Sequence, residues 1–136
     1  MTGLANHALQ KAIYATLVAD APLMAKVTGV WDEPEENAAF PIVVIGEGTT
    51  VDNSTKTEEG QSHTITLHVW SEAKGKMELK EIMGLLYDAL HDAALTLDGH
   101  TSILVRFENS DDLREREGER SIYHGVLRFR VFTQAN

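Results

Sequence analysis

Apolar residues recur along the chain at two different periods, and these periods predict where helices and strands lie. From Leu9 to Leu17 the apolar positions are three and four residues apart, which predicts an amphipathic helix over residues 4–20 with Asn6 as its N-cap. The same spacing predicts a second, longer helix over residues 75–95.

Alternating or β-branched apolar runs predict the strands. In the clearest case Ile65, Leu67 and Val69 point to one face, while His68 and Trp70 point to the other. A brief extended piece is expected around residues 30–31. The four main strands are expected within residues 42–45, 62–73, 100–113 and 121–134.

Polar segments separate these elements. Residues 32–41 hold four acids and two prolines and predict a surface loop, and residues 111–120 predict a charged hairpin connection. Residues 49–61 are polar and rich in threonine, which predicts a long extended arm between the first two main strands. The order α-β-β-α-β-β predicts an α+β fold, in which an antiparallel sheet of about four strands has two helices packed on one face. Residues 1–136 are expected to form a single domain.

The last strand carries apolar residues on both of its faces. Because one layer of helices covers only one face, the other face must meet either the polar arm or another subunit. Trp70 lies opposite Leu67 and favours an interface. The apolar residues on the two faces are Ile122, Val126 and Phe132 on one, and Leu127, Phe129 and Val131 on the other.

Charge and cysteine content exclude several kinds of function. The 136 residues include 12 Lys and Arg against 21 Asp and Glu, a net charge of −9 that argues against a grip on a phosphate backbone. There are no cysteines, so disulfides, thiol nucleophiles and Cys-ligated zinc are excluded. No signal peptide and no apolar run long enough to span a membrane are recognisable, so we expect a protein made in a bacterial cytosol.

Motifs for catalysis or cofactor binding are not found. The sequence has no HExxH, no Gly-x-Ser-x-Gly elbow, no Walker loop and no calcium loop. His68 and His124 share a sheet face if their strands pair, yet a solvated or interface role is favoured there over a metal site. We therefore predict no catalytic, cofactor-binding or metal residues and no enzyme.

Several strings spread over nearly the whole chain resemble one family of viral proteins. The most specific parts are the phrase FPIVV at 40–44, the strand end HVWS at 68–71 with the Lys/Gly helix start after it, and LHD at 90–92. The chain is therefore similar to the tail terminator proteins of long-tailed bacteriophages and gene transfer agents. The matching strings are LQKAIYATLVAD, AAFPIVVIGEGT, STKTEEGQSHTITLHVWSEAKGKMELKEI, LHDAALTLDGH and YHGVLRFRVFT.

The resemblance implies a structural virion protein. It implies a homohexameric ring that terminates tail-tube polymerisation, contacts the tube protein on one face and a head-side stopper or connector on the other, and leaves a channel for DNA. It places the protein in the neck or tail of a virion or phage-like particle, assembled in the bacterial cytoplasm. The candidate tube-contact or channel residues of the arm are Asp52, Lys56, Glu58 and Glu59, and the candidate subunit-interface residues are Trp70, His68, His124, Arg128 and Arg130.

Two alternatives stay open on the sequence. One is a neighbouring ring component of the neck or tail, such as a stopper, an adaptor or the tube protein itself. The other is a small cytosolic ligand-binding or enzymatic α+β domain, to which the missing catalytic residues are the main objection.

Overall fold

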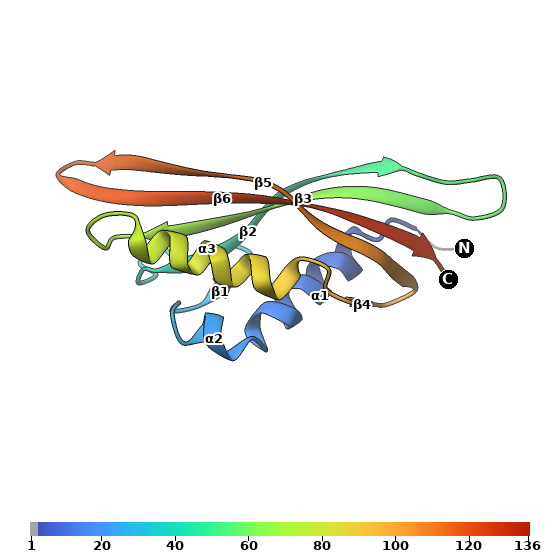
Figure 1. The fold of residues 1–136 in the computed structure, drawn as a ribbon, viewed down its shortest axis with the longest axis horizontal. Coiled ribbons are helices and arrows are strands. Elements are labelled where there is room, and N and C mark those ends of the chain that lie inside the picture. The colour runs from blue at the N-terminus through green and yellow to red at the C-terminus, as the bar shows by residue number, and fades with distance from the viewer. Residues whose placement is uncertain (1–2) are drawn as a thin grey trace.

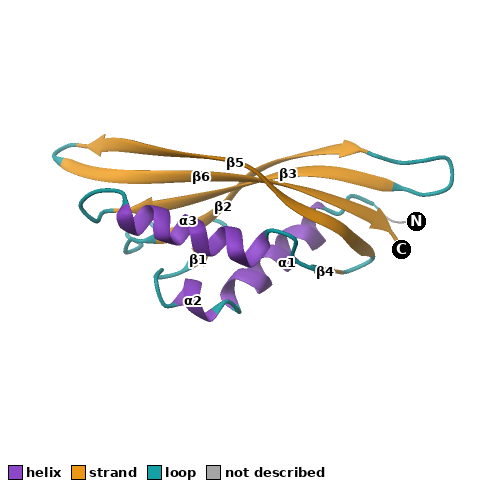
Figure 2. Cartoon of the chain, in the orientation of Figure 1, coloured by secondary structure: helices purple, strands orange, loops and turns teal. Residues whose placement is uncertain are grey.

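The computed structural model describes residues 3–136, and most of this chain forms one curled sheet (Figure 1). The three helices lie on one side of the sheet, and two long hairpins extend toward its opposite ends (Figure 2). In chain order the elements are α1 (Asn6–Val18), α2 (Ala21–Met24), β1 (Val30–Trp31), β2 (Ile42–Asp52), β3 (Gly60–Ser71), α3 (Met77–Leu90), β4 (Thr96–Leu97), β5 (His100–Glu117) and β6 (Arg120–Ala135).

The fold class predicted from the sequence is wrong. The sheet has six strands in the order β1-β2-β3-β6-β5-β4, and it is mixed, because β1 runs parallel to β2 while the other pairs are antiparallel. It curls like half a barrel, so the molecule is mostly sheet and not four antiparallel strands with two helices. The two-residue strands β1 and β4 are too short to show any period, and the parallel pairing depends on the path that residues 32–41 take.

The predicted polar connections are shorter than expected, because the strands continue through them. β2 and β3 remain paired out to Asp52 and Gln61, which leaves only residues 53–59 as a loop. β5 and β6 pair up to a two-residue turn that begins at Gly118, whose φ is 65°. The hydrogen bonds between strands join backbone groups and do not require apolar side chains. A prediction based on side-chain polarity therefore took these strand segments for loops.

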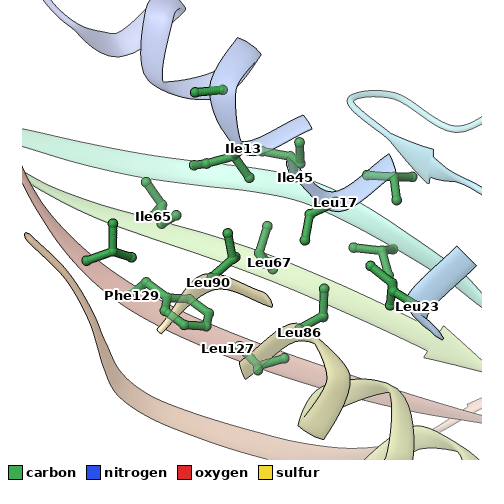
Figure 3. Packing of buried hydrophobic residues seen from close by; sticks show 14 of the residues in the cluster. Ile13, Leu17, Leu23, Ile45, Ile65, Leu67, Leu86, Leu90, Leu127 and Phe129 are labelled. Atoms are coloured by element: carbon green, nitrogen blue, oxygen red, sulfur yellow. The ribbon is translucent and has the colours of Figure 1, made fainter. Parts of the chain in front are cut away.

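The core lies between the helices and the inner face of the sheet (Figure 3). Ile13 and Leu17 of α1 and Leu86 and Leu90 of α3 are fully buried against the sheet residues Ile45, Ile65, Leu67, Leu127 and Phe129. Gly125 allows α3 to approach β6, since a Cβ there would lie 2.7 Å from the Met83 sulfur. The inner face is therefore the one that α1 and α3 cover.

The helix ends differ from the prediction in detail. Asn6 is the first residue of α1 and not its N-cap, and its side-chain oxygen accepts a hydrogen bond from the Thr50 hydroxyl. α3 ends at Leu90, because Asp92 takes a positive φ of 59° and its N–H donates to the Val105 carbonyl. In addition, His91 Nδ1 accepts from the Phe107 N–H at 3.1 Å. These contacts join the end of α3 to β5.

Candidate functional site

The outer face of the sheet, opposite the helices, carries all five predicted interface residues. Trp70 and His124 are cross-strand partners on β3 and β6, and the next rung inward, Val69 and Gly125, faces the core. The partners of His68 and Thr66 on β6 are Val126 and Arg128. We call this outer surface the open face, defined by Ile42, Val44, His68, Trp70, Ile122, His124, Val126, Arg128 and Arg130.

Three aromatic rings stack along the centre of the open face. The Trp70 and His124 rings lie 3.8 Å apart between centroids and 8° from parallel, and the His68 ring follows at 5.0 Å from His124. Gly46 provides the room, because a Cβ at that position would lie 2.6 Å from the His68 ring. Stacking fixes the orientation of Trp70, which is only partly buried.

A chain of hydrogen bonds runs through the two histidines and crosses four strands. Glu47 Oε1 lies 2.9 Å from His68 Nε2, His68 Nδ1 lies 2.8 Å from His124 Nε2, and His124 Nδ1 lies 3.1 Å from Glu115 Oε1. The hydrogen bond from His68, followed by the backbone N–H, lowers the pKa of Glu47. These hydrogen bonds tie β2, β3, β6 and β5 together across the open face.

Arginines continue the open face beyond the histidines. Arg128 donates to Asn109 and Asp111 at 2.8 and 3.1 Å, and Arg130 lies 3.5 Å from Glu108. The Arg128 side chain is half-buried, and the Arg130 side chain is exposed. The charges are thus paired across β5 and β6, and the open face changes from aromatic at one end to charged at the other.

An apolar hollow of about 470 Å³ lies at the aromatic end of the open face. Ile42, Trp70 and Ile122 line it on the sheet, and residues 34–40 form its other wall. The Arg120 guanidinium lies over the Phe40 ring at 5.7 Å. Part of the second apolar face is therefore covered by the chain's own loop, an occupant that the sequence did not suggest.

The predicted arm residues lie at the tip of the β2–β3 hairpin, away from the aromatic stack. Asp52 accepts from the Ser54 hydroxyl at 2.7 Å, and Glu58 accepts from Gln134 at 2.6 Å. The Glu59 carbonyl accepts from the Ala135 N–H, so β6 supports the hairpin along one side. Lys56 is exposed and makes no ion pair with the described side chains of residues 3–116 and 118–136.

Sequence reasoning brought together Trp70, His68 and His124 but missed Glu47 and Glu115, which end the hydrogen-bond chain. Glu47 lies within the register shift of β2 between Ile45 and Gly48, and no period marks such an irregularity. Glu115 joins the site only through the long β5–β6 register. The pairing of charged strands was therefore the missing signal.

Two features that the described part of the chain lacks bear on its chemistry. Among the described side chains of residues 3–116 and 118–136, no group of three or more histidines and acids could hold a metal ion. None of the helices there is both long and apolar enough to cross a membrane.

The open face and the two hairpins are features of a structural protein, one that works through contacts with other proteins. The chain belongs to the tail completion protein gp17 family, whose model matches residues 11–134. This membership confirms the predicted resemblance, and it identifies the chain as a structural tail protein of phage-like particles.

Individual relatives agree with this family. The tail completion protein gp17 of Bacillus phage SPP1 is 29% identical over 133 residues, which cover 98% of this chain and 97% of that protein. A chain of the native gene transfer agent virion matches with a TM-score of 0.87 and 29% identity, covering 98% of this chain and all of that one. The structure of SPP1 gp17 matches with a TM-score of 0.62 and 26% identity, over 99% and 97% of the two chains. The expected location in a virion or phage-like particle is thereby confirmed.

Proposed function

We propose that the chain forms a homohexameric ring that terminates polymerisation of the tail tube and joins the tail to the head-side connector. The observation that carries this proposal is the open face, a sheet surface with a stacked tryptophan and two arginines that the helices do not cover. Such a surface suits contact with another subunit. Each such contact would bury on the order of 800 Å² per partner.

A terminating ring works by matching surfaces and not by catalysis. One side of the ring must offer what the last tube ring can bind, while the other side must lack the surface that would accept another tube ring. Head-to-tail contacts close into a ring when their rotations add up to a full turn. The role proposed here is therefore structural, performed by residues 1–136 as one domain.

The β2–β3 hairpin is the part of the molecule we assign to the tail tube or to the channel wall. Its tip holds Asp52, Lys56, Glu58 and Glu59, and it extends beyond the core on the support of β6. Three of these four residues are acidic, and the whole chain has a net charge of −9. A negative wall repels DNA and lets it pass without a grip.

Electron microscopy of particles assembled without this chain tests the proposal. Abnormally long tails without heads are expected, because nothing would stop the tube or join it to the head. Tails of normal length beside leaking heads would instead assign the chain to a stopper position. Native mass spectrometry of the purified chain tests the ring, and a stable oligomer of another size would contradict six subunits.

A further inference from the structure

Met77 is the most exposed of the large apolar side chains within residues 3–136. It is 82% exposed at the first position of α3. Three lysines lie close to it in the sequence, Lys74, Lys76 and Lys80. Within the described chain only Lys76 has an ion-pair partner, which is Asp112 at 2.6 Å. The start of α3 therefore presents an apolar knob among lysines.

The hollow on the open face differs from this knob. Ile42, Trp70 and Ile122 give it an apolar floor, and its charged lining consists of Glu35, Glu36, Glu115 and one cation, Arg116. Glu115 is hydrogen-bonded to His124. Neither Glu35 nor Glu36 forms a salt bridge with residues 3–136. Three carboxylates outnumber the single guanidinium in this lining, so a knob with free lysines matches the hollow in its apolar contact and in the sign of its charge.

Knob and hollow lie on opposite sides of the sheet at the same end of β3. α3 packs on the inner face, where Gly125 meets Met83, whereas Trp70 belongs to the open face. Trp70 lies one residue before the end of β3 at Ser71, and a short connection joins this end to Met77, the first residue of α3. A knob cannot enter the hollow of its own chain from the far side of the sheet, but it can enter that of a second copy stacked on the open face.

We propose that Met77 and its neighbouring lysines dock into the Trp70 hollow of a second copy of this chain. The inference rests on the proposed ring and names the contact that closes it. Two different surfaces on opposite sides of one molecule give a head-to-tail contact, the type that generates rings. The flexible thioether side chain fits an irregular apolar hollow, and Lys74 and Lys80 then lie near Glu35 and Glu36 of the next copy.

Disulfide cross-linking tests this contact directly, because the natural chain contains no cysteine. Met77→Cys combined with Ala38→Cys, which lines the hollow, should oxidise to a ladder of covalent multimers that ends at the ring size. Leu4→Cys combined with Ala38→Cys is the matched control, because Leu4 is also largely exposed. An equal ladder in the control would mean random collision and would overturn the contact.

Charge reversal gives a second readout that does not depend on cysteine chemistry. Lys80→Glu and Glu36→Lys should each raise the dissociation constant of the oligomer about tenfold, and the double variant should return it to within about threefold of the natural value. Additive losses without recovery would overturn the pairing.

The outcomes separate this contact from the proposed function. A six-membered oligomer that shows no Met77–Ala38 cross-link overturns the contact and leaves the ring in place. Cross-linked rings support the contact. If particles that lack the chain nevertheless have normal tails, the terminator function is overturned while the contact stands. A chain that neither oligomerises nor cross-links overturns both.

Discussion

His63 and His68 lie on opposite faces of β3, and the surroundings of each ring decide its chemistry. His68 reaches the open face and bonds to Glu47 and His124. His63 is 2% exposed on the inner face, where its two ring nitrogens lie 3.0 and 2.9 Å from the hydroxyls of Thr50 and Thr133. Two hydroxyl partners satisfy a neutral imidazole, and burial lowers the pKa of His63.

The first prediction concerns the pH dependence of folding. Below the ordinary histidine pKa of about 6.5, His63 binds a proton in the unfolded chain, whereas in the folded chain it stays neutral until the pH reaches its lowered pKa. The free energy of unfolding therefore falls as the pH falls from about 6.5 toward that lowered pKa. His63→Gln should reduce this loss. Urea denaturation between pH 7 and pH 5 measures it, with His7→Gln as an exposed control. An unchanged slope in His63→Gln would contradict the assignment.

At the scale of elements, the close packing of α3 on β6 and the length of the two hairpins distinguish this fold from a simple layer of helices on a sheet. The periods of the sequence located α1, α3, most of β3, β5 and β6, and the first four residues of β2. They did not show that the strands extend to Asp52, Gln61 and Glu117, because those parts are polar and are held by backbone bonds. The arm and the open face could be proposed from the sequence, but their partners Glu47, Glu115 and Gln134 depend on register.

The second prediction tests the approach of α3 to the sheet. Gly125→Ala places a Cβ 2.7 Å from the Met83 sulfur and 3.2 Å from Leu79, both within the core. The variant should lose about 1–3 kcal/mol of stability through overpacking. Gly84→Ala is the control, since a Cβ there meets nothing within 4 Å, and it should gain up to about 1 kcal/mol from helix propensity. Thermal unfolding compares them, and equal midpoints would refute the close-packing argument.

The third prediction concerns the β2–β3 hairpin. Deleting residues 51–59 joins Thr50 to Gly60 and leaves a short hairpin loop ahead of the Thr50–His63 pair. The domain should still fold, because the deleted residues lie outside the buried core, but tails should not be completed correctly. Circular dichroism checks folding, and microscopy of particles checks tail length and head joining. Normal tails with joined heads would remove the hairpin from the proposed mechanism.

At the scale of the whole molecule, the folding of a single chain explains only in part why the open face carries apolar residues. Ile42, Ile122 and Val126 are buried there, beside a tryptophan that remains partly exposed. Residues 34–40 wall the hollow at the aromatic end of this face. Assembly would complete the burial that folding begins, so a change at Trp70 should act more on association than on stability.

The fourth prediction is that Trp70→Ala weakens assembly more than folding. The isolated chain loses one stacking contact with His124 and should lose about 1 kcal/mol of stability. Association should weaken by more than about tenfold, since a central aromatic side chain would be missing from the interface. Sedimentation measures association and thermal unfolding measures stability. A large loss of stability with unchanged association would reverse the assignment.

The sequence by itself determined the periodic elements, the acidic charge, the absence of cysteine and the membership in a tail completion family, because period, composition and motif are local properties of a chain. Only the tertiary structure decided the parallel β1–β2 pair, the six-stranded order, the continuation of the strands through polar segments, and the meeting of Glu47, His68, His124 and Glu115. These features depend on which strands become neighbours and in which register. Contacts between residues far apart in the chain determine the strand neighbours and the register, because one face of the sheet must be buried under α1 and α3.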